Sequence, residues 1–288
     1  MAETIRSKEI NEVKMHAFMG KVVGDFGASL STILGYIGHR LGLYEALADS
    51  DGLTPAELAA KTKTTERYVR EWLLNQACGD YVHYDPQTGK YSMLPEQAVA
   101  LTDEESPFYV GGGFYVIKAM LNAQPRIAEA FENGGGMLWG EHDSDLFVGT
   151  EKFFRPGYTA HLVGEWIPSL YGIKEKLEAG AKVADVGCGH GASTIIMAKA
   201  FPNSEFFGFD NHRASIATAR TKAEAAGLTG RVHFAVSNAG DIPLDGYDLI
   251  CFFDCLHDMG DPHGAAKRAC QALADGGSCM IVEPMAGN

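Results

Sequence analysis

Three glycines at alternate positions, Gly187, Gly189 and Gly191, have the spacing of a ligand-binding turn. A run of small and β-branched residues precedes them and an apolar run follows, which predicts a strand, a tight turn and a helix. Glycine adopts positive φ and lets a ligand approach the backbone, and the first N–H groups of a helix have no intrahelical partner. Asp185 can attract a ligand cation, and Asp210, which ends the next strand-like run, suits the hydroxyls of a ribose. This pattern predicts a loop that binds a nucleotide-like cofactor.

The loop allows two cofactor interpretations, besides a glycine turn that binds nothing. The stretch 185–191 resembles the D-x-G-x-G-x-G fingerprint of class I S-adenosylmethionine (SAM) methyltransferases. The looser dinucleotide pattern G-x-G-x-x-A also fits, with Ala192 as its last residue, so NAD is the alternative. Asp185 and the third alternate glycine favour SAM over NAD.

The resemblance implies further contacts to SAM. Methyltransferases of this class often carry an aspartate for the adenine amino group after the third strand. Here Asn238 occupies that position, and Asp241 is the second candidate. The cofactor-binding residues that the resemblance implies are Asp185, Gly187, Cys188, Gly189, Gly191, Asp210, Asn211, Asn238, Ala239 and Phe253.

The segment 257–261 reads His-Asp-Met-Gly-Asp and follows the fourth strand-like run. It resembles the H-D-W-x-D segment of plant-type small-molecule O-methyltransferases, which share an N-terminal winged helix used for dimerisation. In that family the histidine deprotonates the substrate hydroxyl and an acid that closes the fifth strand orients it. The resemblance therefore implies His257 as the base and Glu283 as its orienting acid. The chain departs from the family because Met259 replaces the tryptophan, Phe253 stands where the family has a cofactor-contacting lysine, and a second orienting acid has no counterpart.

A histidine base also follows from the chemistry of methyl transfer. A sulfonium methyl is already a strong electrophile, so catalysis needs alignment and a partner for the departing hydroxyl proton. Histidine suits that role near neutral pH. The alternative for His257 is a structural or capping role at a strand end. We expect no metal in the site.

The segment 103–176 is rich in aromatic residues and contains two glycine triplets, at 111–113 and 134–136. Aromatic residues at this density usually form a core, but beside flexible glycine loops some can line a substrate cavity and its lid. The candidate pocket residues are Trp139, Phe154, Tyr158 and His161. They indicate a planar apolar acceptor, which with His257 predicts methylation of a small aromatic hydroxyl compound. The sequence does not identify the acceptor, and leaves O, N and C as the methylated atom.

Residues 1–102 are expected to form an all-α winged-helix domain, with helices that start near Pro55 and Glu66 and a hairpin over 81–94. Before them, a short helix over 1–19 and a longer one over 20–47 are expected. Glycines and Ser31 in this second helix recur four residues apart, which permits close helix packing, either within the domain or across a dimer.

A winged helix suggests DNA binding, so a SAM- or ligand-responsive DNA-binding regulator is the alternative function. Residues 1–101 carry 10 Lys and Arg against 13 Asp and Glu, a net charge of 10 − 13 = −3. A DNA-binding surface needs basic residues to neutralise phosphates. The charge therefore favours a structural or dimerisation role.

From residue 182 onward strands and helices alternate, which predicts an α/β domain over 177–288 with a doubly wound, Rossmann-like parallel sheet. The expected strands are 183–186, 205–209, 232–236, 249–253 and 278–282. Residues 103–176 are expected to be a helical connector that contributes the substrate pocket. Class I sheets normally continue with two further strands, so we expect a sheet truncated after its fifth strand, with its C-terminal strands missing.

Composition narrows the class of protein. The 288 residues suffice for two domains, and the net charge of −13 argues against a polyanionic partner. With no apolar run of 18 residues and no signal pattern, we expect a soluble cytoplasmic protein. The six cysteines are expected to be buried reduced thiols. The expected partners are a small-molecule acceptor and a second copy of the chain, with no nucleic acid or membrane.

Overall fold

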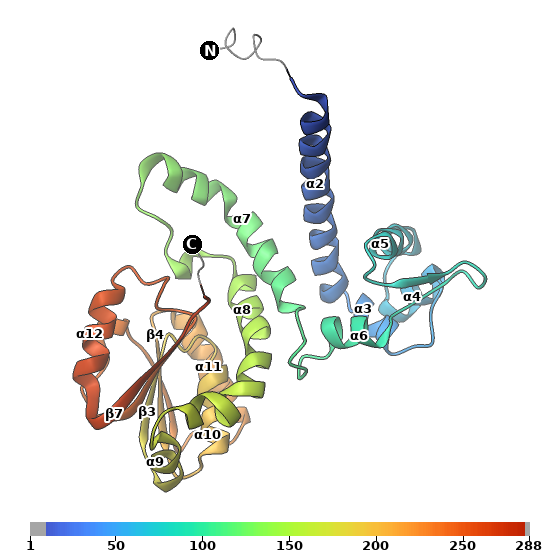
Figure 1. Ribbon diagram of the computed structural model, residues 1–288. Helices are drawn as coiled ribbons and strands as arrows, with labels where there is room; N and C mark the ends of the chain where they lie inside the picture. The colour runs from blue at the N-terminus through green and yellow to red at the C-terminus, as the bar shows by residue number, and fades with distance from the viewer. Residues whose placement is uncertain (1–9, 286–288) are drawn as a thin grey trace. The chain divides into compact units, whose positions relative to one another are not determined.

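The computed structural model describes residues 10–285 of the chain. Contacts between Cα atoms divide the chain into two compact units, with the boundary between Thr102 and Asp103. The first unit is mainly helical and carries a short hairpin, and the second contains a five-stranded sheet (Figure 1).

Among the described residues, the first helix of the first unit is the long α2 (Glu12–Arg40), whose N-terminus is capped by the Asn11 side chain. The prediction of separate helices over 1–19 and 20–47 was wrong. No proline stands near residue 20, and the chain stays helical through Gly20 and Gly24. Residues 1–9 of the predicted first helix lie outside the described residues. The other elements of this unit are α3 (Leu43–Ala48), α4 (Pro55–Thr62), α5 (Glu66–Cys78), β1 (His83–Asp85), β2 (Lys90–Ser92) and α6 (Pro95–Thr102).

The predicted winged helix is confirmed. Thr54 caps α4 in a reciprocal pair with Glu57, and Pro55 occupies the first helical position. The strands β1 and β2 pair antiparallel to form the wing. The glycines of α2 do not share one role. A Cβ on Gly38 would lie 2.6 Å from Trp72 and from Tyr44, so this glycine serves packing inside the unit.

In the second unit, two helices cross at a pair of glycines. They are α7 (Gly112–Asn133) and α8 (Ser144–Gly157). A Cβ on Gly149 would lie 2.8 Å from Val116 N and 2.9 Å from Gly112 O, so the helices meet backbone to backbone. The prediction that the triplet 111–113 is a flexible loop was therefore wrong, because these residues start a helix and permit its close packing. The triplet 134–136 is a loop with positive φ at each glycine.

The predicted doubly wound α/β sheet is confirmed. All four strand pairings are parallel and the order is β5-β4-β3-β6-β7. The strands are β3 (Lys182–Val186), β4 (Glu205–Asp210), β5 (Val232–Val236), β6 (Tyr247–Phe253) and β7 (Leu273–Val282). The last strand starts five residues before the predicted Ser278. Since the strand order reverses between β3 and β6, a ligand site is expected at their carboxyl ends.

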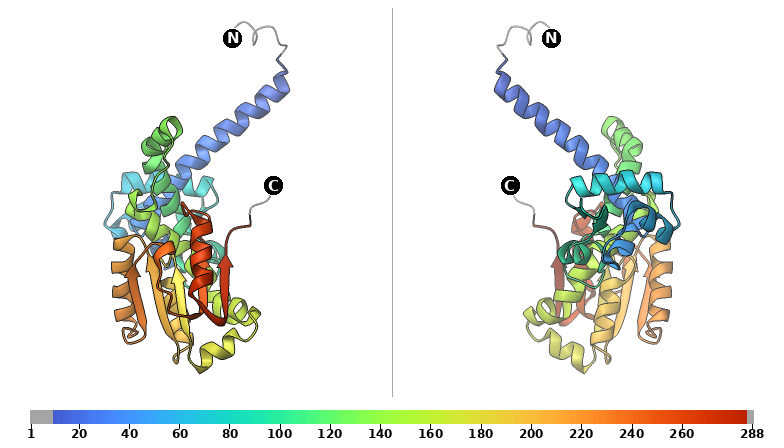
Figure 2. Two further views of the ribbon diagram at one scale, coloured as in Figure 1. Left: turned by 90° about the vertical axis from the view of Figure 1, so that its left-hand side faces the viewer. Right: turned by 90° about the vertical axis from the view of Figure 1, so that its right-hand side faces the viewer.

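Helices cover both faces of the sheet. Side chains at alternate strand positions pack on α9 (Ile173–Ala179), α10 (Ala192–Ala200) and α11 (Arg213–Ala225). The opposite face packs on α12 (Pro262–Ala272). Figure 2 shows β7, drawn in red, at one edge of the sheet. Four short elements complete the unit: η1 (Trp139–Glu141), the π-helix η2 (Tyr158–Trp166), η3 (Ile167–Ser169) and η4 (Ala239–Asp241).

Two sequence-based expectations concern the whole chain. Within residues 10–285 there is no helix whose length and apolar character would let it cross a membrane. The six cysteines are not uniformly buried: Cys188 and Cys251 are, whereas Cys78 and Cys270 are exposed.

Candidate active site at the carboxyl ends of the strands

The glycine loop follows β3 directly, as its sequence predicts. Gly187, Gly189 and Gly191 all have positive φ, of 77°, 52° and 78°. A Cβ on Gly187 would lie 2.7 Å from Cys255 Sγ, and one on Gly191 would lie 2.5 Å from the Phe234 ring. In the described part of the chain, no atom lies within 4 Å of such a Cβ on Gly189. The outer glycines therefore serve packing, while the middle one leaves open space over the loop.

Asp185 lies inside the sheet beneath this loop and is 1% exposed. Its Oδ2 accepts hydrogen bonds of 2.6 Å from Ser193 Oγ and from Thr194 Oγ1, which ties β3 to the first turn of α10. Its Oδ1 is buried and has no partner among residues 10–285. Burial raises the pKa of Asp185 to about 6; the charge of Asp210 adds to this, and the two hydroxyl bonds oppose it. Asp185 therefore has a structural role that the sequence did not predict, and its Oδ1 makes no hydrogen bond within residues 10–285.

Asp210 ends β4 beside the loop. Its Oδ2 accepts a hydrogen bond from Gly189 N at 2.9 Å, and its Oδ1 accepts one from His212 N at 2.8 Å. Each oxygen of an ionised carboxylate has a second acceptor position. Asp210 thus fixes the loop and can still accept hydrogen bonds from a ligand.

The cofactor residues expected beyond the glycine loop follow the ends of β4 and β5. Asn211 follows Asp210 and is exposed. Asn238 is exposed and precedes Ala239, the first residue of η4. The Nδ2 of Asn238 donates to Asp241 Oδ2 at 3.1 Å, so the two candidates for the adenine contact hold each other. Ser237 N donates to Asp210 O at 3.0 Å, which places this segment next to β4.

Phe253 ends β6 and is 6% exposed. Its ring lies 5.3 Å from that of Tyr158 and 6.4 Å from that of Trp166, measured between centroids. Most of its surface is therefore taken up by aromatic packing.

His257 and Glu283 are brought together, although 26 residues separate them. The His257 Nδ1 is hydrogen-bonded to Glu283 Oε2. The other oxygen, Oε1, accepts hydrogen bonds from the backbone N–H groups of Cys255 at 3.2 Å and Leu256 at 2.8 Å. Since an ionised carboxylate only accepts, the Nδ1 carries the proton and Nε2 is available as a base. The Nε2 lies 3.4 Å from Asp258 Oδ1.

The charges around His257 favour its protonated form. The hydrogen bond to Glu283 raises its pKa most, and the negative charges of Asp258 and Asp254 add to the effect. Asp254 has a φ of 51° and a buried Oδ1 with no partner in the described chain. Ligand atoms of Asp254, His257 and Glu283 lie within 4.8 Å of one another, a grouping that could also hold a metal ion.

The histidine segment and the glycine loop touch each other. Cys255 lies two residues before His257, and its Sγ donates to Val186 O at 3.1 Å. The strands that carry the two segments, β3 and β6, are paired through Val186 and Phe252. The structure therefore places the candidate base beside the candidate cofactor loop.

The four candidate pocket residues fall into two groups. Phe154 stacks on Tyr158 at 6.3 Å, and His161 stacks on Trp166 at 6.1 Å, all on α8 and η2. Burial raises the pKa of Tyr158, and the charges of Asp185, Asp254, Cys255 and Glu283 add to this effect.

The fourth pocket residue, Trp139, lies with a different group. Its ring packs on Phe147 at 5.7 Å, and Phe147 stacks on His212 at 4.1 Å. It is therefore on the Asp210 side of the loop.

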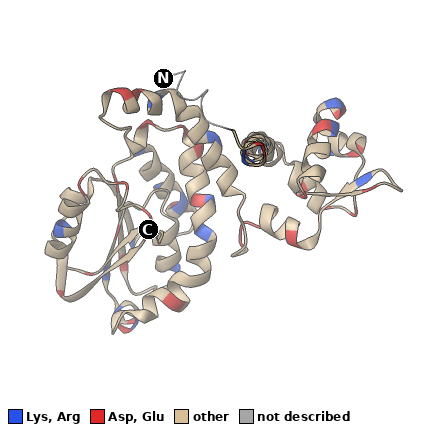
Figure 3. Ribbon diagram, turned by 45° about the horizontal axis from the view of Figure 1, so that its top comes forward, with Lys and Arg blue, Asp and Glu red and all other residues tan. Residues whose placement is uncertain are grey.

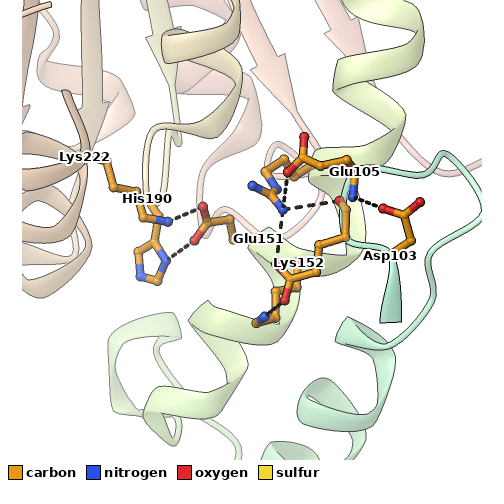
Figure 4. A network of polar contacts seen from close by, with 8 residues as sticks. Asp103, Glu105, Glu151, Lys152, His190 and Lys222 are labelled. Carbon is orange, nitrogen blue, oxygen red and sulfur yellow. Dashed lines mark hydrogen bonds and ion pairs between the residues drawn. The ribbon is translucent and has the colours of Figure 1, made fainter. Parts of the chain in front are cut away.

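Sequence reasoning missed the polar contacts that hold the loop from outside (Figure 4). Glu151 of α8 bonds to His190, which lies between two of the loop glycines, and to Lys222 of α11. Nearby, Glu104 pairs with Lys152 and Arg155. The members of these pairs are 39 to 71 positions apart in sequence, and no local pattern signals them.

Comparisons with known proteins agree with this architecture. Residues 177–287 match the family described as "Methyltransferase domain", and residues 28–103 match the "Rv2258c-like winged HTH domain". The chain resembles an O-methyltransferase, cnsE, of Penicillium expansum with 27% identity over 127 residues, which are 43% of this chain and 46% of that protein. It resembles a trans-aconitate 2-methyltransferase of Acidovorax sp. with 33% identity over 103 residues, 35% of this chain and 38% of that protein.

The solved structure of mitomycin 7-O-methyltransferase MmcR has the same fold, with a TM-score of 0.72 and 17% identity; 96% of this chain and 83% of that one are covered. The chain spans less than half the length of the two curated relatives. The chain therefore contains a methyltransferase domain and an N-terminal winged helix, and its fold is that of MmcR.

Proposed function

We propose that this protein transfers a methyl group from SAM to a hydroxyl group of a small aromatic compound. The observation that carries the proposal is the contact between the glycine loop and the segment of His257, made through Gly187 and Cys255. The loop alone would indicate cofactor binding. The imidazole–carboxylate pair beside it adds a base where an acceptor has to lie.

The residues present fit SAM. Space is open over Gly189, and Asp210 keeps acceptor capacity for the ribose hydroxyls. Asp185 is buried beneath the loop, so it would act on the ammonium group of the methionine part through its charge. Asn238 would contact adenine, with Asp241 as the second candidate. Asn211, Ala239, Gly187, Cys188, Gly191 and Phe253 would shape the rest of the site. Bound SAM supplies an electrophilic methyl group.

In this mechanism His257 Nε2 accepts the proton of the acceptor hydroxyl as the oxygen attacks. Glu283 holds Nδ1–H, which fixes the tautomer and stabilises the imidazolium that results. Its other oxygen is held by two backbone N–H groups, so the carboxylate is itself positioned. The chain's part is to align the acceptor and to take its proton.

The aromatic residues of α8 and η2 support a planar acceptor. Phe154, Tyr158 and His161 lie on consecutive turns, and the Tyr158 ring packs on that of Phe253 at the end of β6. Trp139 belongs to the cofactor side of this proposed pocket. The experiment is a screen of phenolic and quinol-like compounds with radiolabelled SAM. Transfer only to acceptors without a hydroxyl would contradict the proposal.

Glu283→Gln tests the orienting role of the carboxylate. Only neutral His257 accepts a proton, and Glu283 is the largest cause of its raised pKa, so transfer should rise with pH through that raised pKa. In the variant the rise should shift to lower pH, and the plateau rate should fall by about 3- to 10-fold because the imidazole is held less well. The measurement is kcat against pH at saturating SAM. A pH profile identical to that of the unaltered chain would remove Glu283 from the mechanism.

The winged helix keeps a DNA-binding regulator as the alternative function. On α5, Arg67 pairs with Glu71 and Arg70 pairs with Glu66, so the basic side chains of the expected recognition helix are neutralised. Figure 3 shows acidic and basic positions interspersed. This disfavours phosphate binding, and a gel shift with random duplex at low salt should show none. Salt-sensitive retention of the duplex would favour the regulator.

We also propose that α2 joins two copies of the chain. It exposes a set of apolar side chains beside Gly20, Gly24 and Gly27, where an added Cβ would meet, among residues 10–285, no atom within 4 Å apart from the helix's own backbone. These side chains are Val13, Phe18, Met19, Val23, Phe26 and Leu30. So large an apolar face on one helix is typical of an interface. Light scattering should give a dimer, and Phe26→Glu should yield monomers; a monomeric unaltered chain would contradict this.

A further inference from the structure

The carboxylate of Glu151 is shared between the cofactor loop and a helix. Its Oε2 lies 2.8 Å from His190 Nδ1, and its Oε1 forms an ion pair with Lys222 Nζ. The side chains of His190 and Glu151 are 10% and 15% exposed, so this contact is largely withdrawn from water. Figure 4 shows the imidazole and the ammonium group pointing to the same carboxylate.

His190 is the loop residue whose side chain reaches α8. It lies between Gly189 and Gly191, both at positive φ, and glycine backbone is intrinsically free to take other conformations. The N–H of Gly189 is fixed by Asp210 on the inner side. The bond from His190 to Glu151 fixes the loop on the outer side.

The carboxylate of Glu151 is suited to accept a hydrogen bond from the imidazole of His190 at neutral pH. Burial raises the pKa of Glu151, but the hydrogen bonds from His190 and Lys222 and the charge of Lys222 outweigh this, so the pKa is lowered overall. Glu151 therefore stays ionised and accepts from His190 Nδ1–H. The three side chains line a cavity of about 590 Å³, which gives Lys222 room to turn into water when the carboxylate is removed.

The same helix also contacts the other side of the cofactor site. Phe147, one turn before Glu151, stacks on His212 with ring centroids 4.1 Å apart and planes at 25°. His212 N in turn donates to Asp210 Oδ1. Helix α8 thus holds both segments that would enclose the ribose, the glycine loop and the end of β4.

We infer that Glu151 is a positioning residue for SAM, which acts through His190 to keep the glycine loop in its binding conformation. This inference rests on the proposed function. It assigns to Glu151 an effect on cofactor affinity, with little effect on the methyl-transfer step once SAM is bound.

Calorimetric titration with S-adenosylhomocysteine (SAH), the product, measures the effect directly. Glu151→Ala should weaken binding by about tenfold, the lower range for a charged hydrogen bond, because Glu151 does not touch the ligand itself. Glu151→Gln keeps an oxygen for His190 Nδ1–H and should recover most of the affinity. KM for SAM should rise as Kd does, while kcat at saturating SAM stays within about twofold.

A double-mutant cycle tests the route through His190. His190→Ala should weaken binding as Glu151→Ala does, and the double variant should be no weaker than either alone. Additive losses would overturn the inference, because Glu151 would then act independently of the loop. Unchanged Kd in Glu151→Ala, or a fall in kcat alone, would overturn it too.

A matched control is the pair of Glu205 and His233, whose carboxylate and imidazole lie 3.0 Å apart. Glu205 is the first residue of β4, so this pair lies at the end of the strand away from the glycine loop. Glu205→Ala should leave SAH affinity unchanged. If Glu151→Ala does not fold, as judged by thermal unfolding, the Gln variant and His190→Ala carry the test, and unchanged Kd in both would overturn the inference. If the unaltered chain binds neither SAH nor SAM, the proposed function itself fails, a result distinct from failure of the Glu151 inference.

Discussion

His257→Ala should lower methyl transfer to a hydroxyl acceptor by about 10²- to 10⁴-fold, the range for loss of a general base. SAM affinity should stay nearly unchanged, because the side chain lies beside the glycine loop and does not form it. His257 is half exposed, so its removal leaves no large cavity. The measurement combines transfer rates with radiolabelled SAM and calorimetric affinities on the same preparation.

The matched control is His233→Ala. His233 also pairs with a glutamate and is similarly exposed, but it lies on β5 outside the site, so transfer should be unaffected. Because Asp254, His257 and Glu283 could together hold a metal ion, the assay should be repeated with EDTA. If the unaltered chain stays fully active in EDTA and His257→Ala still loses methyl transfer, the results support His257 as a base and not as a metal ligand. Equal rates in His257→Ala and the unaltered chain would mean that alignment alone suffices, or that the acceptor is not a hydroxyl.

Asp210→Ala should weaken SAM binding by about 10- to 100-fold, which corresponds to losing charged hydrogen bonds worth about 1.5–3 kcal/mol. The change removes the acceptor for the ribose hydroxyls and frees the N–H groups of Gly189 and His212. Both effects weaken the binding of the cofactor. Calorimetric titration with SAM and SAH measures their combined effect on Kd.

Asp248 provides the control for this change. Its Oδ2 also accepts a backbone N–H, that of Lys182 at 3.1 Å, but at the beginning of β3, the end of the sheet away from the loop. Asp248→Ala should leave SAM affinity unchanged even if it lowers the melting temperature. An equal loss of affinity in both variants would mean that Asp210 acts through general stability only.

The sheet and the winged helix could be predicted because their signals are local. Strand runs of apolar residues, the cap at Thr54 and the hairpin turn are each contained in a short segment. The continuous helix α2 was missed because each interior glycine costs only about 1 kcal/mol, too little to end a helix without a proline or cap. The helix that starts at the first glycine triplet could not be predicted, because the glycine on which it packs, Gly149, is more than 30 positions away.

Part of the candidate site could be predicted because its residues stand in local sequence patterns. The prediction was incomplete because other contacts of the site depend on how the helices pack. The glycine loop, Asp210 and His257 stand in short patterns, and parallel strands bring their carboxyl ends to one edge. The use of Asp185 by Ser193 and Thr194 depends on the angle at which α10 leaves the loop. The Glu151–His190 contact depends on where α8 packs, which sequence spacing does not specify.

Calorimetric titration of the purified chain with SAM, SAH and NAD tests the central claim most directly. The account predicts saturable one-to-one binding of SAM and of SAH, weakened in Asp210→Ala, and no binding of NAD. Tight binding of NAD with none of SAM or SAH would contradict it, because the alternate glycines would then serve a dinucleotide.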